Sequence, residues 1–232
     1  MMVEIVNGSD FTGQKLPYLP QRFALFNDVV DGQAFAIKGR TGDSPAVRLP
    51  NPPEGLNVLV YQARDAIVNY DDWDTFVRFT EHKDLQGALE KHRARGLAEE
   101  AFTEVYSRYS KSLVGVGNSA GKDTRTGLET EIVALDNPYT DDVSGGMRFQ
   151  LFYRDDVRAN VRFEVYDRAP DGTVTRTFYK TDGQGTVKVP VQKGHEYMAD
   201  AVLLREPAAD KAAQSGALWE SLWANMTWQV PG

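Results

Sequence analysis

The chain contains no cysteine. This absence excludes thiol nucleophiles, disulfide frameworks and cysteine-ligated zinc as the basis of a function. Histidine is scarce as well, with only His82, His92 and His195 in 232 residues. No apolar run reaches the roughly 18 residues that a membrane-spanning helix needs, and Met1 to Phe11 lack the basic start and apolar core of a signal peptide. We therefore expect no transmembrane segment in this chain.

Excess positive charge is also lacking, because the net charge is -7. A negative chain disfavours a phosphate-backbone ligand, so we expect no nucleic-acid partner. At this length the chain is long enough for two ordinary domains or one large all-β domain, each with a proper core.

The first part of the sequence, up to about residue 66, alternates short β-type runs with turn clusters such as Asn7-Gly8 and Asp31-Gly32. This alternation is typical of a β-sandwich. The clearest strand is 57–63, where nearly every residue is apolar, which predicts burial on both of its faces.

A helical insert is expected at about 71–110. Its first helix opens at Asp72, a residue suited to capping, and its second spans 83–95, before Gly96. A third helix is predicted over 98–110 from the helical spacing of four large residues, followed by a strand over 111–116. These four residues are Phe102, Val105, Tyr106 and Tyr109.

The segment 118–127 is rich in small and polar residues and is the expected linker between two domains, 1–117 and 128–232. Beyond it, short strands separated by turn signals again predict a sandwich. The last strand, at 222–230, places Trp228 on the core face and Trp223 on the opposite face.

Five segments, in the same order, carry a family resemblance: TFVRFTEHKDL, YSRYSKSLVGVG, GLETEIVALDNPY, TDGQGTVKV and WESLWANMTWQV. In these segments the chain resembles a bacterial family of exported proteins of unknown function, once described as the substrate-specific region of nickel uptake. The resemblance covers about three quarters of the chain.

The resemblance implies a periplasmic protein with two β-sandwich domains, immunoglobulin-like or transthyretin-like. It also implies a link to nickel or cobalt uptake and an envelope transport protein or a small ligand as partner. Family members commonly begin, after a signal peptide, with a His-Glu-aromatic segment that would bind metal. No residue before Gly8 corresponds to that segment, so the resemblance supports the fold more strongly than the metal.

The leading candidate ligand site is a polar cluster around the boundary between the two predicted domains. On the predicted helix Arg108 is four residues from Glu104 and close enough to pair with it, and Arg108 could also bind an anionic ligand. The alternative is a structural ion-pair network that holds the domains in register. The candidates are Tyr106, Arg108, Lys111, Glu129, Glu131 and Trp223.

For a metal, the candidate is His82 with Glu81, against the alternative of a solvated helix face. Three aspartate pairs, 71–72, 141–142 and 155–156, could serve a carbohydrate-active enzyme, although aspartate beside turns and helix starts is favoured for capping. A third hypothesis is a structural adaptor that recruits an envelope protein by strand addition. Of the three, we favour a non-enzymatic ligand- or partner-binding protein.

Overall fold

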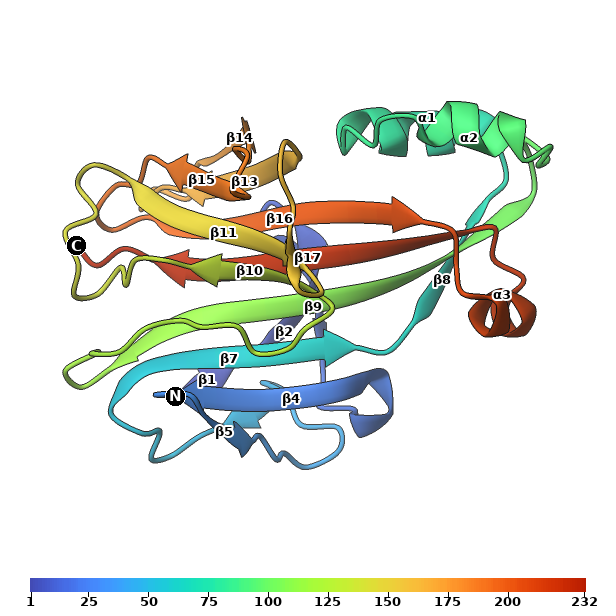
Figure 1. Cartoon of the computed structure of the whole chain (residues 1–232). Helices are drawn as coiled ribbons and strands as arrows, with labels where there is room; N and C mark the ends of the chain where they lie inside the picture. The colour runs from blue at the N-terminus through green and yellow to red at the C-terminus, as the bar shows by residue number, and fades with distance from the viewer.

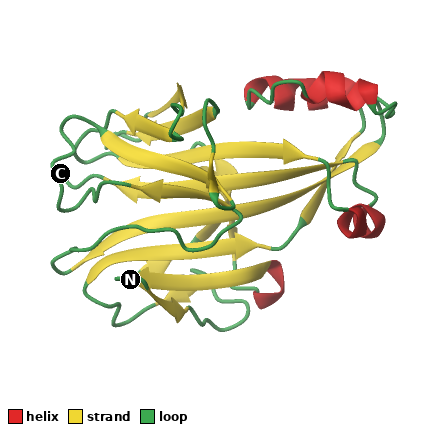
Figure 2. Cartoon of the chain, viewed as in Figure 1, coloured by secondary structure: helices red, strands yellow, loops and turns green.

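The computed structural model describes residues 1–232 and is 47% strand and 12% helix (Figures 1 and 2). The predicted mainly-β fold class is therefore confirmed. No helix is both long and apolar enough to cross a bilayer.

Most strands belong to one nine-stranded sheet. Its order is β14 (Val174–Lys180), β13 (Arg162–Arg168), β16 (Glu196–Arg205), β17 (Trp219–Gln229), β9 (Phe102–Val116), β7 (Gly55–Ala63), β4 (Phe23–Val30) and β5 (Gln33–Ala36), and β8 (Ala66–Tyr70) also pairs with β9. The β9–β17 pair is parallel, whereas the other pairs of this sheet are antiparallel. This parallel pair joins strands that precede residues 118–127 to strands that follow them.

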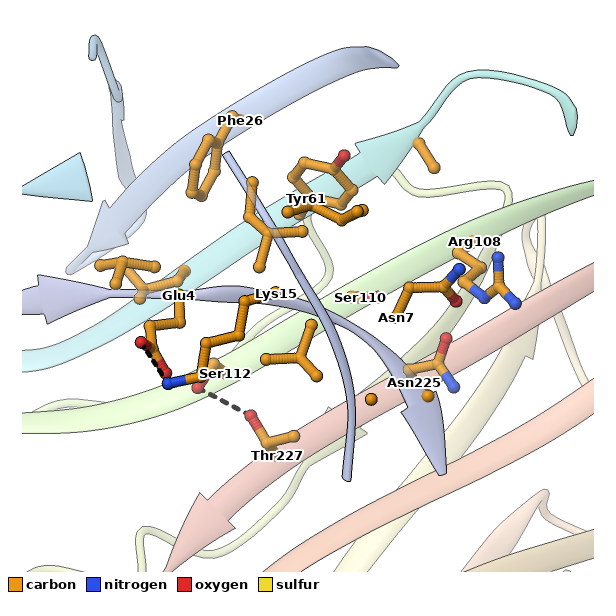
Figure 3. Close-up of a pocket in the computed structure, with 18 of the residues that line it drawn as sticks. Glu4, Asn7, Lys15, Phe26, Tyr61, Arg108, Ser110, Ser112, Asn225 and Thr227 are labelled. Carbon is orange, nitrogen blue, oxygen red and sulfur yellow. Dashed lines mark hydrogen bonds and ion pairs between the residues drawn. The ribbon is translucent and has the colours of Figure 1, made fainter. Parts of the chain in front are cut away.

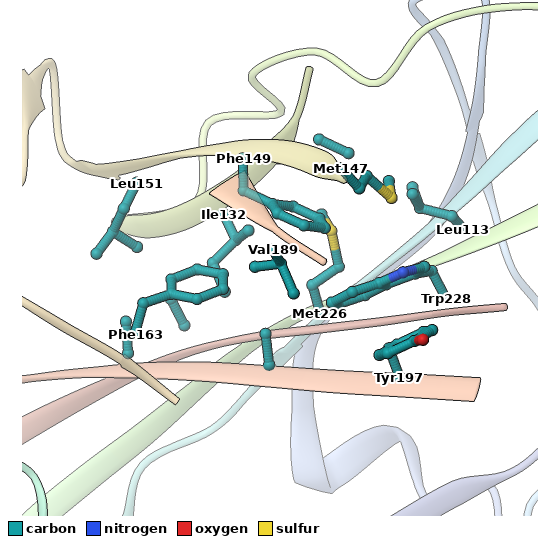
Figure 4. Packing of buried hydrophobic residues seen from close by; sticks show 14 of the residues in the cluster. Leu113, Ile132, Met147, Phe149, Leu151, Phe163, Val189, Tyr197, Met226 and Trp228 are labelled. Atoms are coloured by element: carbon teal, nitrogen blue, oxygen red, sulfur yellow. The ribbon is translucent and has the colours of Figure 1, made fainter. Parts of the chain in front are cut away.

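A smaller sheet packs on one face of the large sheet. It contains β10 (Thr130–Ala134), β11 (Met147–Tyr153), β12 (Asp156–Val157) and β15 (Thr186–Val189). Between the two sheets lies the main core, in which Phe149, Phe163 and Met226 are completely buried (Figure 4). Trp228 stacks on Tyr197 in the same core, so the predicted core position of Trp228 is confirmed.

The opposite face of the large sheet is covered by short elements. These are the β2–β3 hairpin (Ile5–Ser9 and Thr12–Leu16), the β1–β6 pair (Met2–Val3 and Val47–Arg48), η1 (Pro20–Arg22), and helices α1 (Trp73–His82) and α2 (Ala88–Ala94). A further helix, α3 (Ala209–Ser215), precedes β17. Strand β7 lies between the core and these short elements, with Val58 and Val60 on one side and Leu59 on the other. Burial on both faces of this strand is thus confirmed.

The prediction of a third helix at 98–110 is wrong, because residues 102–116 form the long strand β9. The helical part of the insert is limited to α1 and α2. Strand β9 pairs with β7 or β8 on one side and β17 on the other, and Tyr109, Lys111 and Leu113 are buried because alternate side chains of β9 point toward the smaller sheet. The helical spacing of four large residues was therefore coincidental, and the period of two determines the structure.

Residues 117–128 contain no helix or strand, but this loop is held against the sheets. Asp123 accepts a hydrogen bond from the Ala134 backbone, and the Asn137 side chain donates to the carbonyl groups of Ser119 and Gly121. The nine-stranded sheet draws strands from both sides of the loop. The division into two domains at 118–127 stays a prediction.

Candidate functional site

A groove of about 1170 Å³ lies between the β2–β3 hairpin and the large sheet. Its floor comes from alternate residues of β7, β9 and β17, which share one face because the registers pair Tyr61 with Ser110 and Asn225 with the same serine. Strand alternation thus directs Arg108 and Ser110 into the groove, and Tyr109 and Lys111 toward the other sheet.

The roof of the groove is anchored at its tip. Asp10 and Phe11 both have positive φ, as a two-residue type I′ turn requires. Arg176 on β14 donates to Asp10 at 3.0 Å, and the Arg168 guanidinium lies 4.5 Å from the centre of the Phe11 ring. The hairpin therefore bridges the face of the sheet from β7 to β14.

Polar groups without partners gather at one end of the groove. In Figure 3 the side chains of Asn7, Arg108 and Asn225 point into the same part of the groove. Arg108 forms no ion pair, and its guanidinium lies 4.7 Å from the Tyr106 ring centre. The Asn225 Oδ1 atom is buried without a hydrogen-bond partner. Such groups are suited to binding a polar ligand.

Lys111, in contrast, belongs to a buried ion cluster between the sheets. Its Nζ lies 2.5 Å from Asp123 and 3.1 Å from Glu131. Glu131 also accepts from Arg125 and from the backbone and hydroxyl of Thr126. Because all of these charges are paired, Lys111 and Glu131 match the structural alternative rather than a ligand site.

Glu129 is likewise paired. It accepts from Arg205 at 2.7 Å and from Arg154 at 3.0 Å, and these guanidinium groups hold the pKa of Glu129 below its usual range, against the effect of burial. Arg205 also forms an ion pair with Glu220, and Glu220 forms a second ion pair with Lys211. This network connects the segment just before β10 with β16 and β17, and all of its charges are paired within the protein.

Trp223 does face away from the core, as predicted, but α1 covers it. The ring stacks on Phe79 with centres 5.9 Å apart, and the Lys83 Nζ lies 4.9 Å from the ring centre. The indole N–H donates to Ser221. Trp223 is half-buried and does not line the groove.

The metal candidate does not fit the geometry. Glu81 is exposed, and the carboxylate beside His82 Nε2 is Glu164, at 3.1 Å. Glu164 is already bound by Lys83 and Arg176. Two cations at the same carboxylate compete electrostatically with a metal ion. No group of three or more His, Cys, Asp or Glu side chains has an arrangement that could hold a metal.

The other two histidines have structural partners. His92 is fully buried, accepts from the Trp219 indole at 3.0 Å through Nδ1, and lies with Nε2 2.9 Å from the Ala98 carbonyl. A neutral ring protonated at Nε2 satisfies both contacts. His195 Nδ1 pairs with Asp167 at 2.7 Å.

All three aspartate pairs lie in exposed positions, and members of the first two bind nearby backbone or hydroxyl groups. Asp72 caps α1 by accepting from the Thr75 backbone at 2.8 Å. Asp141 and Asp142 accept from the backbone of Asn137 and Ser144. Local capping thus accounts for two of the three pairs.

Several polar groups were not singled out from the sequence. Glu164 and Asp200 share Lys83 beneath α1, and Arg22 and Arg64 line the groove near Arg108. Glu104 does not pair with Arg108, because on strand β9 it instead accepts from Tyr70 and Ser221. Burial raises the pKa of this carboxyl group. No local sequence signal marks Glu164, Asp200, Arg22 or Arg64, since the groups around them come from distant parts of the chain.

Together these features define a mainly-β sandwich protein with a hairpin-roofed polar groove. The chain belongs to the family described as Domain of unknown function (DUF4198), which matches residues 1–205. The resemblance drawn from the sequence is thereby confirmed at the level of an unknown-function family. No curated protein and no solved structure matches the chain.

Proposed function

We propose that this chain is an exported, non-enzymatic protein that binds a small ligand in the groove under the β2–β3 hairpin. The observation that carries the proposal is the combination of size and unpaired polar groups. A groove of about 1170 Å³ is large enough for a metabolite-sized ligand. Arg108 lines the groove without an ion pair or a hydrogen bond, and Asn225, which also lines it, has a buried Oδ1 atom that no protein group satisfies.

Ligand-observed NMR tests this proposal with a mixed library of sugars, amino acids, carboxylates, phosphate esters and amphiphiles. Ser110→Trp fills the floor of the groove, and Thr177→Trp adds the same side chain at an exposed position of β14. We expect library members to bind the wild type and Thr177→Trp but not Ser110→Trp. Equal binding by all three proteins, or binding by none, would contradict the proposal.

A periplasmic location is part of the proposal and is supported by the family resemblance. Fractionation of cells that express the complete natural gene tests it. Recovery of the protein in the cytoplasmic fraction alone would overturn it.

The link to nickel or cobalt uptake also rests on the resemblance. Because His82 and Glu81 do not form a ligand set, we propose that any such link acts through an organic ligand or an envelope transport protein. Titration of the protein with nickel and with cobalt, followed by calorimetry, should show no binding that His82→Ala removes. A site abolished by that substitution would reverse this conclusion.

A second candidate function is strand addition to β14. This strand has β13 as its one partner in the sheet, and Thr175 to Phe178 are exposed. An unprotected edge recruits a strand from another chain. A photo-crosslinking residue at position 175 should then capture one envelope protein in living cells, whereas the same residue at position 155 should not. Equal crosslinking from both positions would argue against a docking edge.

A further inference from the structure

We infer that the ligand of the groove is an amphiphilic organic anion, with a carboxylate or phosphate head at the Arg108 end and an apolar body extending toward Leu59 and Val114. The inference rests on the proposed function and names the chemical class of its ligand. It comes from the distribution of charge and apolar surface along the groove.

Three arginines, Arg22, Arg64 and Arg108, line the same end of the groove. Arg64 follows β7 directly and its backbone donates to the Arg22 carbonyl at 2.9 Å, while Arg108 is one residue from the last β7–β9 pair, Gln62 with Tyr109. None of the three guanidinium groups has an ion pair or a hydrogen bond within the protein. Burial raises the pKa of the Tyr61 phenol, and the nearby positive charges of Arg22 and Arg108 offset only part of that rise.

The acidic residues in the groove do not neutralise this end. Glu4 is bound by Lys15 at 2.7 Å, and Asp65 is bound by Lys211 at 2.9 Å. A cluster of unpaired positive charge is notable in a chain with a net charge of -7. Guanidinium groups bind carboxylate and phosphate through paired N–H donors. The Arg108 guanidinium lies 4.7 Å from the Tyr106 ring centre and has no hydrogen-bond partner in the protein, so its N–H groups are available to such an anion.

The other end of the groove carries apolar side chains beside the Lys15–Glu4 ion pair, in which the two charges neutralise each other (Figure 3). Leu59 and Val114 form its floor, Phe26 its side, and Ile5 and Leu16 its roof. Burial of an alkyl or aromatic body there gains free energy in proportion to the apolar area removed from water. The Arg108 end of the groove therefore favours an anionic head group, and the Leu59 and Val114 end favours an apolar body.

The test uses the fluorescent anion 1-anilinonaphthalene-8-sulfonate as reporter, with four competitors of equal chain length. These are dodecanoate, dodecyl phosphate, 1-dodecanol and dodecyltrimethylammonium, all below their micelle concentrations. We expect one or both anions to displace the reporter at least tenfold more effectively than the alcohol and the cation. The ranking of dodecanoate against dodecyl phosphate identifies the head group.

Variants locate the site. Arg108→Met should weaken reporter and anion binding about tenfold or more, as expected for loss of a charged hydrogen bond, and Arg108→Lys should restore part of it. Arg78→Met, on the exposed face of α1, is the matched control and should have no effect. Circular dichroism verifies that each variant is folded.

The possible results separate the two proposals. Displacement by 1-dodecanol or by the cation as effective as that by the anions, with loss of binding in Ser110→Trp, would overturn the anion class and leave the groove as the ligand site. Anion binding unchanged in both Arg108→Met and Ser110→Trp would overturn both proposals.

Discussion

Charged residues that look alike in the sequence have opposite roles in this protein. Lys111 and Arg108 are three residues apart on β9, yet one is sealed between two sheets and the other lines a groove. The odd spacing places them on opposite faces of the sheet. Because a buried ion pair that loses one partner leaves an uncompensated charge, the two residues should differ sharply in their effect on stability.

Lys111→Met should lower the free energy of unfolding by roughly 3 to 5 kcal/mol, because Asp123 and Glu131 remain buried without their shared cation. Arg108→Met should lower it by less than about 1 kcal/mol, since only contacts with aromatic rings are lost. Urea unfolding measures both. Similar losses in the two variants would refute this assignment of roles.

Asp28 on β4 is a buried acid without a cation. It is 4% exposed, its Oδ1 atom has no hydrogen-bond partner, and burial raises its pKa to about 6. The raised value means that the folded state binds the proton more tightly than the unfolded state. The ionised form therefore destabilises the fold above pH 6, and the penalty disappears as the pH falls toward 4.

Asp28→Asn should accordingly raise the free energy of unfolding at pH 7.5 by roughly 1 to 3 kcal/mol. The advantage over wild type should shrink between pH 6 and pH 4. Asp155→Asn, at an exposed position, is the control and should show no such trend. Thermal unfolding across this pH range provides the measurement, and an advantage that does not vary with pH would contradict the burial argument.

Strands and hairpins of this protein differ in local stability, because they differ in the number of strands with which they pair. Strand β9 pairs on both sides, and β17 lies between β16 and β9, whereas the β2–β3 hairpin pairs only with itself. Most hairpin residues are also exposed. Opening of the hairpin therefore exposes little buried apolar surface.

Native-state hydrogen exchange should reveal this order. Amides of β9 and β17 should exchange only through global unfolding, and hairpin amides should have protection factors lower by at least about two orders of magnitude. NMR detection resolves the two classes. Equal protection of the hairpin and β9 would mean that the roof is a fixed part of the fold. An anion bound in the groove should slow exchange in the hairpin.

The secondary structure of a segment could be predicted where its apolar residues fit only one period, that of a helix or that of a strand. The core strand at 57–63 and the helices on either side of residue 85 follow from local patterns. Strand β9 was predicted as a helix because its large residues also satisfy a period near 3.6, and its partner β17 follows it by more than a hundred residues. Local spacing contains no information about such a partner.

At the scale of the whole molecule, β17 holds the large sheet together. It is the strand between β16 and β9, and its residues Leu222, Ala224 and Met226 are completely buried in the main core. The family match ends at residue 205, before this strand. The central strand is thus supplied by residues outside the matched segment.

A chain that ends after Arg205 should fail to fold cooperatively, because β16 and β9 would each lose a neighbour and the core would lose a wall. Leu222→Ala in the full chain is the comparison and should remain folded while losing about 2 to 5 kcal/mol. Circular dichroism with thermal unfolding tests both. A cooperative transition in the shortened chain would show that β17 is dispensable.

The amino-acid sequence alone was enough to predict the mainly-β fold, the burial of β7 and Trp228, and the family. These features follow from local alternation, turn residues and segment order, which need no knowledge of distant partners. The three-dimensional packing was needed to show that Lys111 and Glu131 are buried, while Arg22, Arg64 and Arg108 line a groove. The physical reason is that strand pairing across long separations determines which face each side chain occupies, and the gain from burying whole apolar faces selects that pairing.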